Sequence, residues 1–182
     1  MKDKMKEHYH LDRDSLEKLM KIRPRSALEV LLVVKGIKPG DFIRKYKDGW
    51  RDIFEILKKI KALSLIERPE MVLYYNPEFV GMELIEKLQA IKNFNPKKDI
   101  IVDPKDFEDY TEILGKFFGY PDCCIKSYLR NNTITRYKPG TEHLWCSDDC
   151  QESKEIQKKV FNLVQDEIPQ IKDLTEEFGN LP

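Results

Sequence analysis

The sequence has no cysteine outside residues 123–150, although the chain is 182 residues long. It also has no apolar run that approaches the length of a membrane span, because the densest apolar stretch, residues 27–34, is too short. Residues 1–4 (MKDK) lead into further charged residues and lack the apolar core of a signal peptide. These absences predict a cytoplasmic protein with no membrane partner, and the length is enough for one good core.

The chain has no net charge, but its basic and acidic residues are distributed unevenly along the sequence. The 32 Lys and Arg equal the 32 Asp and Glu, yet residues 1–70 hold 18 basic and 12 acidic residues, and residues 71–182 hold 14 and 20. A dedicated nucleic-acid-binding protein is usually strongly basic, which this chain is not. We therefore expect the two parts to attract each other within one fold. The alternative interpretation is that the basic residues of 1–70 bind a nucleic-acid partner, and no other partner is indicated.

The N-terminal part begins with signals for three helices. Capping-box sequences at residues 14–17 and 26–29 predict the starts of the first two helices. Pro39 suits the first turn of a third helix. In that helix the side chains of Phe42, Ile43 and Tyr46 are expected to face inward.

Helical spacing from Trp50 to Ile60 predicts a fourth helix, and residues 63–66 and 71–75 predict two strands of a β-hairpin. Helices followed by a hairpin are typical of a winged helix, and basic residues surround the third and fourth helices. We expect a helical, winged-helix-like part over residues 12–75 and an α/β part with the cysteines over residues 76–182, packed together as one compact unit. The basic residues are Arg44, Lys45, Lys47, Arg51, Lys58, Lys59 and Lys61.

A strand followed by a helix that starts with proline is predicted twice. Residues 71–75 lead into Asn76-Pro77, and residues 99–102 lead into Asp103-Pro104. In both, the Asn or Asp would cap the helix and the proline would fill its first position. Two such units in succession favour adjacent parallel strands. The predicted fold class is α/β, leaning toward α+β, with a helical N-terminal part, a small partly parallel sheet and C-terminal helices that carry a four-cysteine cluster.

The four cysteines form two pairs, each near a predicted helix start. One pair follows Pro121, and the other brackets Ser147, the expected cap of a long helix. The positive end of a helix favours a thiolate over a thiol, so two helix starts could bring four reactive sulfur atoms together. The polar segment between the pairs, residues 131–145, is long enough to be functional or held at its ends. The predicted metal ligands are Cys123, Cys124, Cys146 and Cys150, with His143 as a spare ligand.

Several chemistries suit this set of residues. Zinc takes four Cys or His ligands in a tetrahedron, although adjacent cysteines are not its usual spacing. Iron–sulfur clusters also take four thiolates, and adjacent cysteines can ligate different irons. In a thiol/disulfide redox protein, Cys123 or Cys124 would bond across to the other pair, because adjacent Cα atoms, about 3.8 Å apart, are too close for a disulfide.

Two further interpretations stay open. The cysteines could be small apolar packing residues at tight helix entries. Cys124 could also act as a nucleophile with His143 as its base, but no flanking signature of a known thiol hydrolase is present. No reaction and no catalytic residue can be assigned from these patterns. We expect zinc as the cofactor, with an iron–sulfur cluster as the alternative.

Two motifs in this region resemble a known family. Residues 118–124 (FGYPDCC) and 143–150 (HLWCSDDC), with Ser153, are similar to a largely archaeal family of unknown function, domain of unknown function 483, in its Gly-Tyr-Pro-x-Cys-Cys and His-x-x-Cys-Ser-x-x-Cys motifs. The likeness is specific over about residues 115–155 and loose over the strand-Pro-helix units before them. It implies that the four cysteines and His143 form one site, and it names no reaction.

Overall fold

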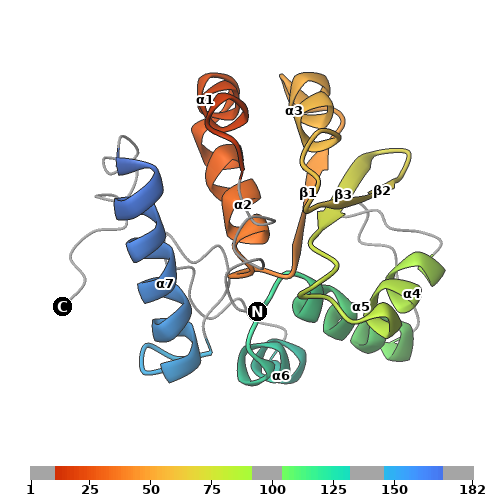
Figure 1. Ribbon diagram of the computed structural model, residues 1–182. Helices are drawn as coiled ribbons and strands as arrows, with labels where there is room; N and C mark the ends of the chain where they lie inside the picture. Colours follow the sequence, from red (N-terminus) through yellow and green to blue (C-terminus); the bar gives the residue numbers. More distant parts are fainter. Residues whose placement is uncertain (1–10, 92–103, 132–145, 170–182) are drawn as a thin grey trace, which may run out of the picture. The chain divides into compact units, whose positions relative to one another are not determined.

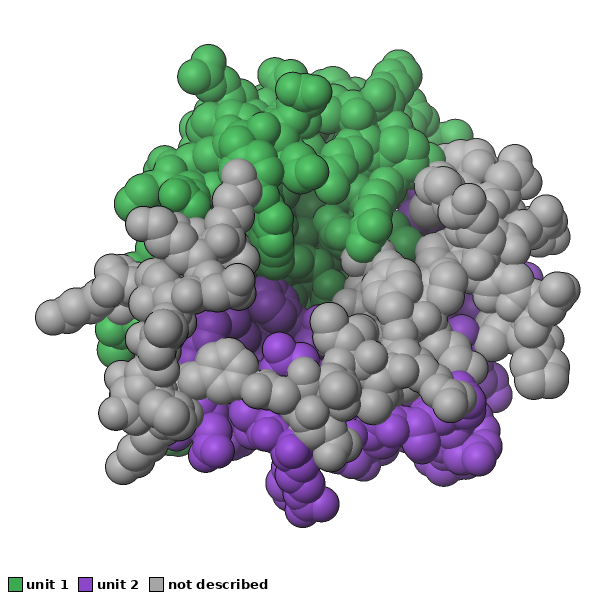
Figure 2. Space-filling model, turned by 180° about the vertical axis from the view of Figure 1, so that it is seen from behind, with its two compact units in different colours: residues 1–101 green, residues 102–182 purple. Residues whose placement is uncertain are grey.

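The computed structural model describes residues 11–91, 104–131 and 146–169 (Figure 1). The chain divides into two compact units, Met1–Ile101 and Val102–Pro182 (Figure 2). The fold is mixed α and β, mainly helical with a small sheet, which confirms the predicted class. The predicted boundary after residue 75 differs from this division, because the hairpin and the helix that follows it belong to the same unit.

The described part of the first unit consists of helices and one three-stranded sheet. The N-cap of its first helix is Asp12, two residues before the predicted cap at residue 14, because the Asp12 carboxylate accepts a hydrogen bond from the Ser15 backbone N–H. The second helix starts with Pro24, which suits the first helical position. In chain order the elements are α1 (Arg13–Ile22), α2 (Pro24–Val34), β1 (Gly40–Arg44), α3 (Trp50–Leu57), β2 (Ser64–Glu67), β3 (Met71–Tyr75) and α4 (Met82–Ala90).

Helix α2 forms the centre of this unit. Residues 30–34 (VLLVV) are all buried, as are Ala27 and Leu28, so the C-terminal half of the helix is apolar on every side. A helix of that kind is stable only when neighbouring elements surround it. It contacts both α1 and β1, and α1 also contacts α3. The core of the first unit therefore lies between the helices and the sheet.

The sheet has the order β1-β3-β2, and both pairings are antiparallel. In the central strand, residues 71–74 are buried, which explains its uninterrupted apolar sequence. The β2–β3 hairpin confirms the two predicted strands. The expected parallel pairing is not found among the described strands, and the strand predicted over residues 99–102 lies outside the described residues.

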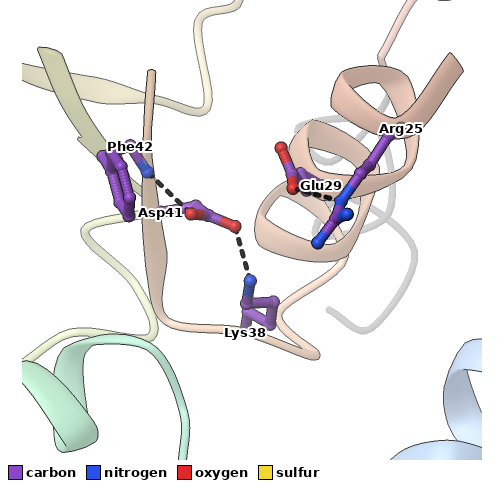
Figure 3. A network of polar contacts seen from close by, with 5 residues as sticks. All are labelled: Arg25, Glu29, Lys38, Asp41 and Phe42. Carbon is purple, nitrogen blue, oxygen red and sulfur yellow. Dashed lines mark hydrogen bonds and ion pairs between the residues drawn. The ribbon is translucent and has the colours of Figure 1, made fainter. Parts of the chain in front are cut away.

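The third helix predicted after Pro39 is wrong, because residues 40–44 form strand β1. In this strand Phe42 pairs with Leu73 of β3, which is distant in the sequence. A buried ion pair fixes the turn that leads into the strand: the Lys38 ammonium donates to the Asp41 carboxylate, which also accepts from the Phe42 N–H (Figure 3). Figure 3 also shows the neighbouring Arg25–Glu29 ion pair on α2.

Asn76 ends β3 in a turn and does not cap a helix, which corrects the first of the two predicted strand-cap-helix units. Its side-chain amide donates to the Val34 carbonyl, and its side-chain oxygen accepts from the Glu78 N–H. Helix α4 therefore begins only at Met82. In the turn after α2, a Cβ on Gly36, at φ 69°, would lie 2.5 Å from the Phe79 ring, so this position requires glycine.

The described part of the second unit is helical and consists of α5 (Pro104–Phe117), α6 (Asp122–Asn131) and α7 (Gln151–Glu167). The proline start of α5 confirms the prediction for Pro104. Helices α5 and α6 pack against each other, and Gly115 leaves room for the Ile125 side chain. None of the helices in the described ranges combines the length and the apolar character that a membrane crossing requires.

Candidate metal centre

A turn between α5 and α6 brings the first cysteine pair to a helix start. Gly119 has φ 76°, its N–H donates to the Lys116 carbonyl at 3.1 Å, and the Tyr120 N–H donates to the Gly115 carbonyl at 2.8 Å. These are the two hydrogen bonds of a Schellman motif, which ends a helix and turns the chain. Pro121 then comes directly before α6. The Gly-Tyr-Pro part of the motif therefore ends one helix and starts the next.

Cys123 and Cys124 lie in the first turn of α6, as predicted. The Cys124 N–H donates to the Pro121 carbonyl at 2.9 Å, which closes that turn. Unpaired N–H groups and the positive end of the helix dipole lie at this terminus. The position therefore favours negative charge on the sulfur atoms.

Cys150 is itself the N-cap of α7, which corrects the prediction that Ser147 caps this helix. The Cys150 N–H donates to the Ser147 carbonyl at 3.3 Å, and the Cys150 carbonyl accepts from the Lys154 N–H at 3.0 Å. The four residues from Cys146 to Asp149 thus form a turn before the helix. This turn brings Cys146 back toward the same helix end.

The four sulfur atoms converge on one point. The Cys123 Sγ lies 3.5 Å from the Cys150 Sγ and 3.9 Å from the Cys124 Sγ, and the Cys124 and Cys150 sulfurs are 3.8 Å apart. All four sulfurs, including that of Cys146, lie within 4.8 Å of one another. Cys124 and Cys150 are buried, and the other two are half-buried. Among the described residues, this is the only group of three or more Cys, His, Asp or Glu that could hold a metal ion.

Hydrogen-bond donors surround the cluster. The Ser153 hydroxyl donates to the Cys150 Sγ at 3.2 Å and lies 3.4 Å from the Cys124 Sγ. The backbone N–H of Ser153 also lowers the pKa of Cys150, and that of Cys146 lowers the pKa of Cys124. Ser153 is completely buried. Sequence reasoning did not select it as a site residue, although it lies three residues after Cys150, where a side chain at the first turn of a helix can reach the cap.

The thiols titrate differently because their surroundings differ. Burial raises the pKa of Cys123, and its hydrogen bonds to Cys150 and Cys146 raise it further. Burial also raises the pKa of Cys124 to about 11, against the hydrogen bond from Ser153. Burial opposes the thiolate at Cys150 as well, but hydrogen bonds from Ser153 and from Cys123 lower the pKa of Cys150 to about 7. Without a metal ion, therefore, Cys150 is the first of these three thiols to ionise.

Acidic side chains lie at the edge of the cluster. A Glu152 carboxylate oxygen is 3.9 Å from the Cys123 Sγ, and the Asp149 carboxylate pairs with the Lys154 ammonium at 3.2 Å. Glu152 lies in the first turn of α7, and Asp122 lies in the first turn of α6. Carboxylates at these positions interact favourably with the helix dipole.

The structure thus brings together four of the five predicted ligands. His143 lies outside the described residues, as does the segment 132–145, so its role as a spare ligand stays a prediction. The sulfur atoms alone supply the four donors of a complete tetrahedral shell. Chemically, such a set can bind a thiophilic metal ion or, if two of the thiols are oxidised, form a disulfide.

No family model, no curated protein and no solved structure matches this chain. The likeness to domain of unknown function 483 therefore stays a proposal that depends on the two sequence motifs.

Proposed function

We propose that Cys123, Cys124, Cys146 and Cys150 bind one zinc ion in a structural site. The observation that carries this proposal is the separation of the sulfur atoms. With zinc–sulfur bonds of about 2.3 Å, tetrahedral geometry places neighbouring sulfur atoms about 3.8 Å apart. The three separations among Cys123, Cys124 and Cys150 are 3.5, 3.8 and 3.9 Å. A small approach by Cys146 would complete the tetrahedron.

The same separations favour a single ion over an iron–sulfur cluster. In a four-iron cluster each thiolate ligates a different iron, so its sulfur atoms must lie farther apart than those around one ion. All four sulfurs here lie within 4.8 Å of one another. Tetrahedral sulfur coordination suits zinc or a single iron, and zinc needs no redox partner. We therefore favour zinc.

A structural role follows from the closed ligand set. A catalytic zinc site usually keeps one position for water or substrate, whereas four cysteine ligands leave none. The ion would connect the first turn of α6 to the start of α7, two elements that are separated in the sequence. Four free thiols suit a reducing compartment, which is why we place the protein in the cytoplasm.

Elemental analysis of protein purified without chelators, both in air and anaerobically, tests the proposal. We expect about one equivalent of zinc per chain and no acid-labile sulfide. The substitutions Cys146→Ser and Cys150→Ser should each reduce the zinc content, whereas Ser147→Ala in the same turn should leave it unchanged. Iron together with labile sulfide would show that the site holds an iron–sulfur cluster and not zinc. One iron without sulfide would show that the site binds a single ion and that this ion is iron. Metal content near zero in both preparations would reject the metal site.

Cys123 and Cys150 give the redox alternative a specific form. Their sulfurs lie 3.5 Å apart, closer to each other than either lies to the Cys124 sulfur. Cys150 has a pKa of about 7 and would supply the thiolate that attacks the oxidant. Forming the disulfide would release two protons and pass two electrons to an oxidant. Thiol titration before and after mild oxidation, followed by peptide mapping, distinguishes the two functions. A metal-free protein that loses two thiols reversibly and shows a Cys123–Cys150 cross-link would favour redox chemistry.

A further inference from the structure

A second surface with distinctive chemistry lies in the first unit, away in sequence from the cysteines. It is formed by the turn after β1 and by α3, which neighbour each other in Figure 1. Aromatic residues recur every four positions along it, and an exposed basic residue directly follows each of the first two. We call it the basic-aromatic face, and it consists of Tyr46, Lys47, Trp50, Arg51, Phe54 and Lys58.

Each ring of this face has a basic group above it. The Lys47 ammonium lies 5.8 Å from the centre of the Tyr46 ring, and the Arg51 guanidinium lies 5.6 Å from that of Trp50. Lys58 is 5.0 Å from the centre of the Phe54 ring. Arg44 and Lys45 make three further contacts of this kind from the strand side. Six such contacts lie within residues 42–58, so basic and aromatic side chains alternate closely along this surface.

The positive charge of this region is only partly neutralised. Residues 44–61 contain seven Lys or Arg and three Asp or Glu, a net charge of +4. Lys45 pairs with Glu67, and Lys58 pairs with Glu55. Within the described ranges, no ion pair is recorded for Lys47 or Arg51, and both side chains are exposed. Tyr46 is 45% exposed, and Trp50 and Phe54 are half-buried, so each ring is at least partly accessible.

We propose that the basic-aromatic face binds single-stranded nucleic acid, through phosphate contacts from its basic groups and base stacking on its rings. Proteins that bind single strands combine a basic surface with aromatic side chains at which successive bases stack. The Trp50 and Phe54 rings, whose centres are 6.3 Å apart, supply two such side chains, Tyr46 precedes them in the chain, and Lys47 and Arg51 supply charge beside them. This function is additional to the metal centre and does not depend on it.

The arrangement of α3 favours a single strand over a duplex. A recognition helix that enters a major groove passes between two rows of phosphates. The exposed side of α3 carries Asp52 and Glu55 beside Arg51, so a rigid duplex would bring one of these rows against the carboxylates, whereas a flexible single strand can follow the basic residues. The rings, in turn, can stack only on bases that are not enclosed in a double helix.

Fluorescence anisotropy with the full-length, metal-loaded protein tests the proposal. The probes are labelled oligouridylate, labelled oligothymidylate of the same length, and a labelled duplex DNA, at about 50 and about 200 mM salt. We expect both single strands to bind more tightly than the duplex, and more tightly at the lower salt concentration. The tighter of the two identifies the ligand as RNA or as single-stranded DNA.

Variants separate charge from stacking. Lys47→Ala with Arg51→Ala should weaken single-strand binding at least tenfold and reduce the magnitude of the salt slope by about 1.4, because each lost phosphate contact contributes about 0.7. Lys158→Ala with Lys159→Ala, which removes the same charge from exposed positions of α7, should leave affinity within twofold. Tyr46→Ala should weaken binding without changing the salt slope, and Tyr46→Phe should restore it.

Three results would overturn the proposal. These are no binding of either single strand at the lower salt concentration, duplex binding as tight as single-strand binding, and equal losses in the two double variants. Circular dichroism of each variant verifies that α3 and the rest of the fold are intact, so that a loss of binding reports on the face itself.

Discussion

The hydroxyl of Ser153 contacts two of the four sulfur atoms and lies completely out of solvent. A donor in that position orients the sulfur lone pairs and stabilises negative charge on them. Groups that hydrogen-bond metal ligands fix the orientation of those ligands and so raise their affinity for the metal. At the residue scale, Ser153 is therefore as much part of the proposed site as the cysteines.

The substitution Ser153→Ala should weaken zinc binding about 10- to 100-fold without changing the stoichiometry. The four cysteine ligands remain, but the hydroxyl that contacts two of their sulfur atoms is lost. Competition with a chromophoric chelator measures the affinity. Ser147→Ala, at an exposed position in the turn before the helix, is the matched control and should bind zinc as the natural chain does. Equal affinity in the two variants would show that Ser153 does not support the ligands.

The pKa of Cys150 predicts how the metal-free protein responds to pH. Its value of about 7 lies below the ordinary 9.0, so the thiolate contributes stability that is fully present above pH 9 and lost as pH falls through 7. The thiolate absorbance in the ultraviolet should therefore rise with a midpoint near pH 7, and the Cys150→Ser variant should lack this step. A first ionisation only near the ordinary value would contradict the hydrogen-bond pattern around Cys150.

At the scale of elements, local signals predicted α3, the β2–β3 hairpin, the proline start of α5 and the placement of Cys123 and Cys124. They failed for β1, because the structure of this segment depends on pairing with a strand that is distant in the sequence. Residues 40–44 have a spacing that is compatible with a helix, yet they pair with β3, about thirty residues later. Short apolar segments of this kind are ambiguous from periodicity alone.

The start of α7 was misplaced for a different physical reason. Serine is a far commoner N-cap than cysteine, so Ser147 was the natural choice from the sequence. In the structure the turn from Cys146 to Asp149 comes first, and the N-cap is Cys150, whose sulfur accepts a hydrogen bond from the Ser153 hydroxyl. The convergence of the cysteines was predictable because both pairs lie near helix starts in either assignment.

Gly115 determines how closely α5 and α6 approach. A Cβ at this position would lie 2.7 Å from the Ile125 Cγ1, so Gly115→Ala should lower the free energy of unfolding by about 1–2 kcal/mol. In an Ile125→Ala background the clash is gone, and the same change should be neutral or stabilising because alanine favours the helix. Chemical denaturation of the four proteins of this cycle measures both effects. An equal loss of unfolding free energy in both backgrounds would show that the clash does not come from the Ile125 side chain.

At the scale of the whole molecule, the two compact units should respond differently to loss of metal. The sequence places Trp50 in the first unit and Trp145 in the second, next to Cys146. Because metal binding energy is also folding energy, chelation should destabilise the unit that contains the cysteines. Variants that keep one tryptophan, Trp50→Phe or Trp145→Phe, allow each unit to be followed by its own fluorescence.

We expect a strong chelator to lower the melting temperature reported by Trp145 and to leave that reported by Trp50 nearly unchanged. Added zinc should reverse the change, whereas magnesium should not, because a thiolate site excludes a hard cation. An equal shift at both tryptophans would show that the two units unfold as one.

In polymer terms, an ion bound at this centre is a reversible cross-link. It joins Cys124 to Cys146 across 21 intervening residues and so closes a loop in the chain. The entropy cost of such closure grows only with the logarithm of loop length, so doubling the number of residues would cost only about 0.6 kcal/mol more. The centre therefore fixes where the two ends of this segment meet and places almost no thermodynamic limit on how long the segment is.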